Sequence, residues 1–355
     1  MTRVRALVPY PLGRVGGQRY RIEQWARHLA PHGVELTLSP FLSARGLDVL
    51  YAPGRVARKT AETLRGYAHR LAERALPAGE EVVYVFREAA LLGPPWLERL
   101  HARRRPVVFD FDDAIYLADT SPANAWARAL KPAGKAAALC GLARHVIAGN
   151  EVLAGFAAVH ARRVTVVPST VDTDEYQVRA RPPNGVPVVG WTGSLTTLPH
   201  LLALAPALRR LRARVPFELR VIGGHVEVPG LDVRCLPWRP QTEVEDLRPI
   251  DVGVMPLPDD DWSRGKCGMK ALQYMALGVP AVVSPVGANA VIVSHGVSGL
   301  HARTDDEWVD ALAELLRDAG LRARLGAAAR ETVERCYSAR VQAPRVAAVF
   351  REAAG

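Results

Sequence analysis

The chain of 355 residues lacks the patterns that identify several common classes of protein. Its four cysteines form no Cys-x-x-Cys pair and no zinc-ligand spacing, which argues against a disulfide framework or a structural metal. It contains no run of about 18 apolar residues, the length that spans a membrane as a helix. Its first residues lead directly into a strand-like segment, with no signal-peptide pattern. We therefore expect a globular protein located in the cytoplasm.

Patterns typical of nucleic-acid binding are also absent, although the net charge is +10. Charge of this sign suits a nucleic acid, an anionic membrane surface or an anionic substrate, and does not decide among them. The sequence has no helix-turn-helix or zinc-finger spacing and no basic stripe interleaved with aromatic residues. We expect no nucleic-acid partner, and we attribute the strong preference for arginine to a GC-rich bacterial genome.

Short β-branched runs alternate with longer helical patterns along the chain, as in a parallel sheet with crossover helices. The length favours two domains, and a stretch containing Pro and Gly at 178–185 separates two halves with similar patterns. We predict an α/β fold with a domain at 1–178, a second domain at 186–337 and a final segment at 338–355. The predicted strands are 3–8, 34–38, 82–86, 106–110, 145–148, 164–167, 186–191, 217–222, 232–235, 252–255, 281–284 and 299–301.

Lysine is scarce, and its placement is informative. Only five of the 46 basic residues are lysines, and two of these, Lys266 and Lys270, flank Gly268 at the start of a predicted helix. Gly268 allows a close backbone approach, the first helical turn offers unpaired N–H groups with a positive dipole end, and the two ammonium groups add positive charge. This combination suits a diphosphate. Lys270 and Gln273 share one face of the helix. The apolar face that would lie on a sheet holds Met269, Leu272 and Ala276.

Segment 265–291 resembles the donor-site helix of retaining, nucleotide-sugar-dependent glycosyltransferases of the GT-B fold, specifically the family 4 type. The commonest form of that motif carries two glutamates separated by seven residues, and Gly265 and Gln273 stand at those positions here. The resemblance covers essentially the whole chain. It implies two Rossmann-like domains facing across a cleft, with the final helix, Ser338 to Glu352, crossing back to the first domain.

The same resemblance implies the roles of residues in the second half. The amides of Gly268 and Met269, together with Lys266 and Lys270, would bind the donor diphosphate, and Gln273 would meet the ribose hydroxyls because an amide both donates and accepts.

Two further segments of that half each have two open interpretations. Gly193 and Ser194 either donate to the distal phosphate or form only a capped turn. Trp238 either stacks on the nucleobase or covers the core.

In the first half, Gly16 and Gly17 follow the first predicted strand. Such a pair is often only conformational, but the family's first loop carries a matching pair that reaches the donor across the cleft. No Gly-x-Gly-x-x-Gly dinucleotide fingerprint is present.

Three carboxylates, Asp110, Asp112 and Asp113, end another predicted strand, where α/β proteins place their chemistry. In the family interpretation, Asp112 or Asp113 contacts the transferred sugar or the acceptor. The alternatives are the Asp-x-Asp metal site of glycosyltransferases with the other common fold, a phosphatase nucleophile motif, and structural capping.

We predict a retaining glycosyltransferase that moves a sugar from a nucleotide diphosphate donor to a small-molecule, lipid-linked or glycan acceptor, with no metal and no cofactor. Asp112, Asp113 and Lys270 are the candidate catalytic residues. One alternative is a magnesium-dependent phosphohydrolase that uses Asp110 and Asp112. The other is a non-catalytic GT-B-like protein that binds nucleotide or glycan.

The predicted helix at 55–75 is basic and amphipathic. Such a face is usually only solvated, but it could also rest on anionic lipid, which would place the protein peripherally on the inner membrane face.

Overall fold

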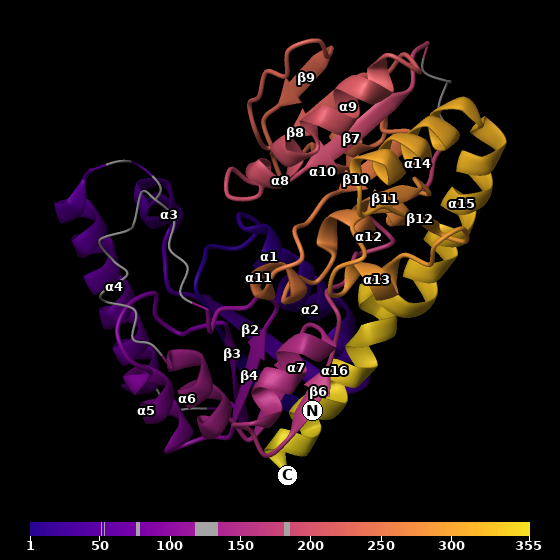
Figure 1. Cartoon of the computed structure of the whole chain (residues 1–355). Coiled ribbons are helices and arrows are strands. Elements are labelled where there is room, and N and C mark those ends of the chain that lie inside the picture. Colours follow the sequence, from indigo (N-terminus) through magenta and orange to yellow (C-terminus); the bar gives the residue numbers. More distant parts are fainter. Residues whose placement is uncertain (51, 53, 76–78, 118–133, 181–184) are drawn as a thin grey trace. The chain divides into compact units, whose positions relative to one another are not determined.

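The computed structural model describes residues 1–355 except 51, 53, 76–78, 118–133 and 181–184. The chain divides into two compact units (Figure 1). The first unit is Met1–Ser169 with Gln342–Gly355, and the second unit is Thr170–Val341. Each unit contains one six-stranded sheet in which every neighbouring pair of strands is parallel. The predicted α/β fold is confirmed, and each of the predicted strands is present to within two residues at either end.

The first unit has the strand order β2-β1-β3-β4-β5-β6. Its strands are β1 (Thr2–Val8), β2 (Val34–Pro40), β3 (Val82–Phe86), β4 (Val107–Phe111), β5 (His145–Ala148) and β6 (Val164–Val166). Its helices are α1 (Gly16–Gln18), α2 (Gln24–Leu29), α3 (Ala44–Leu50), α4 (Val56–Ala75), α5 (Trp96–Ala102), α6 (Lys135–Leu142), α7 (Glu151–Ala158) and most of α16 (Ala339–Ala354).

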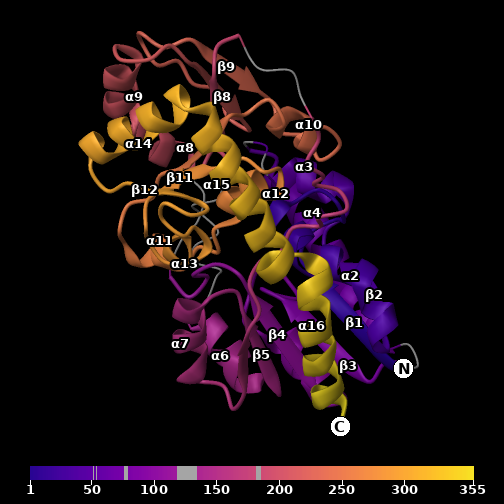
Figure 2. The same cartoon turned by 90° about the vertical axis from the view of Figure 1, so that its right-hand side faces the viewer.

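The central strands of this sheet are buried on both faces. β3 is apolar and buried throughout, as expected of a parallel strand covered by helices on both sides. On one side the ring of Phe350, from α16, meets the ring of Tyr84 edge-on with 5.7 Å between centroids. Figure 2 shows α16 lying along this sheet.

The second unit has the strand order β12-β11-β10-β7-β8-β9. Its strands are β7 (Val188–Thr192), β8 (Glu218–Ile222), β9 (Val233–Leu236), β10 (Val252–Met255), β11 (Ala281–Val283) and β12 (Gly299–His301). Its helices are α8 (Leu198–Ala203), α9 (Ala205–Arg212), α10 (Glu243–Leu247), α11 (Asp261–Arg264), α12 (Met269–Ala276), α13 (Asn289–Ile292), α14 (Asp305–Arg317) and α15 (Ala319–Thr332).

Two apolar cores lie on opposite faces of the second sheet. Val189 and Trp191 point into the core formed with α9 and α14, whereas Val188 points into the core formed with α12. This alternation follows from the two-residue period of a strand. Leu272 is fully buried in the second of these cores, so the apolar face of α12 lies on the sheet as the helical spacing predicts.

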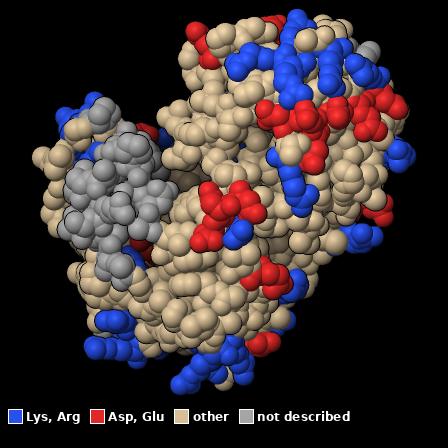
Figure 3. Space-filling view, viewed as in Figure 1, with Lys and Arg blue, Asp and Glu red and all other residues tan. Residues whose placement is uncertain are grey.

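The outer surfaces of α9 and α14 carry opposite charges. Figure 3 shows a band of Lys and Arg beside a band of Asp and Glu over these two helices. Arg210 pairs with Asp306, and Arg214 pairs with Asp310 at 2.7 Å. Exposed pairs of this kind contribute about 0–1 kcal/mol each to stability. Part of the large positive charge is therefore compensated on the surface.

The boundary between the units lies at Ser169–Thr170, earlier than the stretch predicted at 178–185, of which 181–184 fall outside the described residues. The segment that follows Thr170 packs within the second unit. Val171 forms a β-bridge with Ser338, and the Tyr176 hydroxyl donates to Glu243. The sequence predicted the boundary from Pro and Gly content, but these contacts hold residues 170–180 to the second unit.

The strand orders locate the ends of the sheets where ligands are expected. The order reverses between β1 and β3 in the first unit and between β7 and β10 in the second. In open α/β sheets, ligands bind outside the carboxyl ends of the strands at such a reversal. Each unit therefore has one expected binding edge.

Candidate functional site

In the second unit, the turn after β7 lies at the expected binding edge. The Gly193 amide donates to the Ile222 carbonyl at 3.0 Å, and the Ser194 amide donates to the Thr197 hydroxyl at 3.1 Å. The Ser194 hydroxyl lies 2.8 Å from the Thr196 hydroxyl. Gly193 and Ser194 thus form a hydrogen-bonded turn, and their amides would have to exchange these bonds to donate to a phosphate.

Two glycines at this edge are required by close packing. A Cβ at position 193 would lie 2.5 Å from the Trp191 ring. Gly223, which follows β8, has φ of 90°, and its Cβ would lie 2.0 Å from the Gly193 carbonyl oxygen and 3.3 Å from the Trp238 Cβ. The turns after β7 and β8 and the connection after β9 therefore form one continuous surface that includes Trp238.

The two lysines and the N-terminus of α12 adjoin this surface. The Lys270 Nζ lies 5.7 Å from the centroid of the Trp191 ring, and the Lys266 Nζ lies 5.0 Å from that of the Trp262 ring. Gly268 precedes α12 with φ of 67°, and a Cβ there would lie 2.2 Å from the Ile292 side chain. The left-handed backbone and this contact both require glycine. The amides of Met269 and the next residues form the first turn of the helix, and N–H groups at a helix N-terminus point towards a ligand bound there.

His200 joins these lysines, although the sequence gave no reason to assign it a ligand-binding role. It lies in the first turn of α8, the helix that follows the Gly193 turn. Burial lowers the pKa of His200, and the charges of Lys266 and Lys270 lower it further, against an opposing effect of Asp260. The position of a titratable side chain in the helix after a strand-order reversal is the signal that could have identified it.

Gln273 lies inside the second unit and is 4% exposed. Its Nε2 donates to the Tyr176 hydroxyl and to Glu243 Oε1, both at 3.1 Å. The Trp238 indole N–H donates to the same Oε1 at 2.7 Å, and the Tyr176 hydroxyl donates to Oε2 at 2.9 Å. Gln273 and Trp238, both predicted donor-site residues, are thus joined through a glutamate that the sequence did not single out.

In the first unit, Asp110 is fully buried. The Arg21 guanidinium donates to both of its oxygens, at 2.9 Å and 2.6 Å, and the Tyr84 hydroxyl also donates to it. A carboxylate held in this way is a structural anchor for Arg21. The geometry does not fit Asp110 as a metal ligand or a nucleophile, which removes the main support for both Asp-x-Asp interpretations.

Asp112 and Asp113 belong to a different cluster, centred on Arg87. The Arg87 Nε donates to Asp112 Oδ1 at 2.7 Å, and its Nη2 lies 3.9 Å from Asp113. A Cβ on Gly17 would lie 3.0 Å from Arg87 Nη2 and 3.1 Å from Asp112 Oδ2, and a Cβ on Gly16 would lie 3.3 Å from the Tyr20 ring. The structure therefore brings the predicted glycine pair and the two predicted catalytic aspartates together around an arginine that the sequence analysis missed.

A small pocket of about 140 Å³ adjoins this cluster at the reversal between β1 and β3. Arg87, Glu88 and Lys135 supply its charges, and the Lys135 ammonium donates to Glu88 at 2.9 Å. The remaining lining residues are Pro9, Tyr10, Ile115, Ala136 and Leu139.

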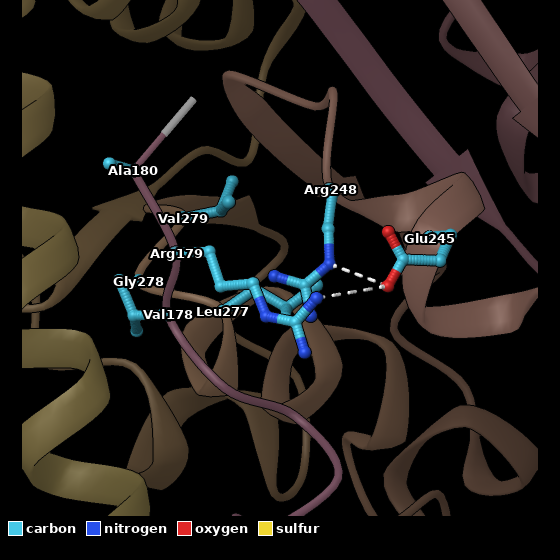
Figure 4. Close-up of a pocket in the computed structure, with 8 residues that line it drawn as sticks. All are labelled: Val178, Arg179, Ala180, Glu245, Arg248, Leu277, Gly278 and Val279. Carbon is cyan, nitrogen blue, oxygen red and sulfur yellow. Dashed lines mark hydrogen bonds and ion pairs between the residues drawn. The ribbon is translucent and has the colours of Figure 1, made fainter. Parts of the chain in front are cut away.

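A larger pocket of about 370 Å³ in the second unit contains no predicted site residue (Figure 4). Arg179 and Arg248 both approach one carboxylate, that of Glu245, at 3.9 Å and 3.0 Å. Its other lining residues are Val178, Ala180, Leu277, Gly278 and Val279. Leu277, Gly278 and Val279 precede β11 and so lie at the amino end of the sheet. Ligands of such sheets bind at the opposite, carboxyl end, so we assign this pocket no role in catalysis.

Part of the second unit is similar to a known family of proteins. Residues 186–318 match the model of the family described as Glycosyl transferases group 1. A D-inositol 3-phosphate glycosyltransferase of Stackebrandtia nassauensis is 31% identical over 211 residues, which cover 50% of this chain and 46% of the relative. The protein of the same name from Corynebacterium urealyticum is 29% identical over 192 residues, 45% of this chain and 44% of the relative. The chain thus spans about half the length of the curated relatives that it matches.

Solved structures resemble the whole chain. Sucrose-phosphate synthase from Thermosynechococcus elongatus aligns with a TM-score of 0.73 at 14% identity, over 99% of both chains. HepE of Anabaena, in complex with UDP and glucose, aligns with a TM-score of 0.68 at 15% identity, over 99% of this chain and 100% of the other. The fold is that of GT-B glycosyltransferases.

Proposed function

We propose that this protein transfers a sugar from a nucleoside diphosphate donor, and that the donor binds at the carboxyl edge of the second unit's sheet. The main support is the position of the Lys270 ammonium over Trp191, beside the turn after β7 and on the first turn of α12. Lys266 adds a second ammonium group at the same edge, and both lysines act on the neighbouring His200. UDP is the first donor nucleotide to test, because HepE of the same fold was solved with UDP and glucose.

The chemistry follows from where charge develops. As the bond from the anomeric carbon to the phosphate oxygen breaks, negative charge grows on the leaving diphosphate. Lys270, Lys266 and the α12 amides would stabilise that charge more in the transition state than in the ground state. We propose retention on one face of the sugar, with the acceptor oxygen bonding to the anomeric carbon while its proton passes to the departing phosphate. This route needs neither a protein nucleophile nor a metal.

We propose that the first unit's cluster orients hydroxyl groups of the sugar or acceptor. Asp112 and Asp113 can accept hydrogen bonds from hydroxyls, and Arg87 keeps the Asp112 carboxylate in place. The acceptor would be a small molecule, a lipid-linked sugar or a glycan. Inositol phosphate is a reasonable first acceptor to test, because the relatives are named for it.

A turnover assay tests the proposal. The measurement is the rate of UDP release from UDP-glucose, with and without inositol phosphate or a glycan acceptor. This rate should be higher for the parent protein than for the Lys270→Ala variant. If nucleoside diphosphates raise the melting temperature but no acceptor supports turnover, the non-catalytic alternative gains support.

We also propose that α4 contacts an anionic membrane surface. This helix has an unusual orientation of its side chains: Arg70 is fully buried and donates to the Val8, Ser39 and Ala89 carbonyls, whereas Leu64 is 62% exposed. The inward side chains also include both acids of the helix, Glu62 and Glu73, which accept from Ser43 and Arg70.

The outer face of α4 is therefore apolar and positively charged. We define it by the exposed residues of α4, Val56, Ala57, Arg58, Thr60, Ala61, Leu64, Arg65, Ala68, His69, Leu71 and Ala72. Apolar side chains flanked by arginines, with no acid among them, match the interface of an anionic bilayer. We propose a peripheral contact. Among the described residues no helix is both long and apolar enough to cross a membrane.

A further inference from the structure

The second unit contains a buried carboxylate with three hydrogen-bond donors. Glu243, the first residue of α10, is 1% exposed. Its oxygens accept from Trp238, Gln273 and Tyr176 at 2.7, 3.1 and 2.9 Å. These three residues come from the connection after β9, from α12 and from the segment after Thr170. A single side chain therefore links three separate parts of the unit.

The directions of these hydrogen bonds explain why an amide stands at position 273. The Tyr176 hydroxyl gives its one proton to Glu243, so it can only accept from Gln273. Both partners of the Gln273 nitrogen are therefore acceptors. A carboxylate at 273 would face two oxygens, one of them charged, and two carboxylates in contact cannot both ionise without a large cost. The second glutamate of the family's motif is Gln273 in this chain, and a glutamate at this position would be incompatible with the ionised Glu243 beside it.

The network also determines the orientation of Trp238. Its indole N–H points at Glu243, and its Cβ lies against Gly223 at the carboxyl edge of the sheet. The residue is half-buried at the edge where the donor is proposed to bind. A flat aromatic surface in a fixed orientation suits the stacking of a nucleobase.

We propose that Glu243, Gln273 and Tyr176 are positioning residues that hold Trp238 as the stacking surface for the donor's nucleobase. This inference rests on the proposed donor site. It assigns Gln273 a role in fixing Trp238, in place of direct contact with the ribose. The stacking surface contributes affinity for a nucleoside diphosphate but none for inorganic pyrophosphate, which only the lysines and helix amides would bind.

The first test is an exchange of the two side chains. Gln273→Glu should lower the melting temperature, and the loss should grow as the pH rises. At low pH one of the two carboxyls, Glu243 or the new Glu at 273, is protonated and the repulsion is avoided. At higher pH the folded state must either ionise both carboxyls or hold a proton that the unfolded chain releases. The double variant Glu243→Gln, Gln273→Glu restores one amide and one carboxylate and should recover most of the loss. Glu245→Gln alters an exposed residue of α10, the helix that also carries Glu243, and is the matched control. It should change neither the melting temperature nor its dependence on pH. A Gln273→Glu variant as stable as the parent at every pH would overturn the coupling.

The second test separates positioning from folding. By calorimetry, Trp238→Ala and Gln273→Glu should each weaken binding of the tightest ligand among UDP, GDP, ADP and dTDP by about tenfold, the scale of one stacked base. Binding of pyrophosphate should stay unchanged, and the double variant should regain nucleotide affinity. Equal losses for both ligands, or none for the nucleotide, would refute the stacking surface. A parent protein that binds neither the nucleotides nor pyrophosphate would instead refute the donor site itself.

Discussion

Arg87 stands in a left-handed backbone conformation, with φ of 56°, and donates from its Nε to Asp112 Oδ1 at 2.7 Å. A residue other than glycine in this conformation costs about 1–3 kcal/mol and persists only where its surroundings hold it. The Asp112 side chain is 8% exposed, so the ion pair is largely shielded from water. Strain and a shielded ion pair at the carboxyl edge of a sheet together point to a functional cluster.

Removing Arg87 should therefore destabilise the fold. We expect Arg87→Ala to lower the free energy of unfolding by about 3 kcal/mol, because the buried Asp112 carboxylate would lose its ion pair with Arg87. Asp112→Asn should cost less in the Arg87→Ala background than in the parent, since it removes that charge. Denaturant titration of the parent, the two single variants and the double variant gives the coupling free energy between Arg87 and Asp112. Additive effects would show that the pair is not coupled.

Lys270 should act on the reaction and Leu272 on the fold. Lys270→Ala should lower kcat/KM by an amount equivalent to about 2–4 kcal/mol with little change in stability, as when one preorganised electrostatic group is removed. Leu272→Ala should instead lower the free energy of unfolding by about 2–5 kcal/mol, because the side chain is fully buried. Steady-state kinetics and denaturant titration on both variants distinguish the two. Full turnover by Lys270→Ala would place the diphosphate elsewhere.

Sugar transfer should continue in excess EDTA. The proposed diphosphate site uses lysines and helix amides, and the buried Asp110 is already paired with Arg21. Initial rates before and after chelation are the measurement. Complete loss of activity, restored by manganese or magnesium, would contradict the charge argument.

Nucleotide binding should take up a proton at His200. Burial and the neighbouring Lys266 and Lys270 lower its pKa in the free protein, against the opposing charge of Asp260. A bound diphosphate would offset the lysine charges and raise that pKa. Affinity for UDP should therefore increase as the pH falls towards the His200 pKa in the free protein, and level off below it. Calorimetry in buffers of different ionisation enthalpy measures the proton, and His200→Gln should abolish its uptake.

The lowered pKa also has a consequence for stability. The folded state favours neutral His200, whereas the unfolded chain protonates it near its ordinary pKa. The parent should thus lose stability as the pH falls below about 6.5, the ordinary histidine pKa, and His200→Gln should lose less. Equal acid sensitivity in both proteins would argue against the described surroundings of His200.

The outer face of α4 should bind anionic vesicles. We expect the protein to sediment with vesicles rich in phosphatidylserine but not with vesicles of pure phosphatidylcholine. The bound fraction should decrease at high salt. The double variants Leu64→Ala, Leu71→Ala and Arg58→Glu, Arg65→Glu should each reduce binding. Val159→Ala, which alters an even more exposed apolar residue at the end of α7, is the control. Equal binding by all variants would refute the proposed surface.

Local patterns were sufficient to predict the elements of this fold. The two-residue period of β-branched runs, the helical spacing between them and the turn residues determined each strand to within two residues, because each depends on neighbours only a few positions away. The placement of Lys266, Lys270 and Gly268 at the start of a helix was predicted on the same basis. The unusual choice of lysine made those positions visible in the sequence.

The sequence by itself thus determined the α/β class, the order of strands and helices along the chain and the segment that carries the proposed diphosphate site. Only the tertiary structure decided which side chains meet there. Gln273 meets Tyr176 across 97 positions and Glu243 across 30, and Arg87 meets Asp112 across 25. No local period encodes such pairs, because parallel strands need long crossover connections that bring distant residues to one edge of the sheet. The burial of Asp110 and the inward orientation of Arg70 have the same origin: a charged side chain is buried where the folded chain supplies partners from other segments, and those partners are known only once the sheet is assembled.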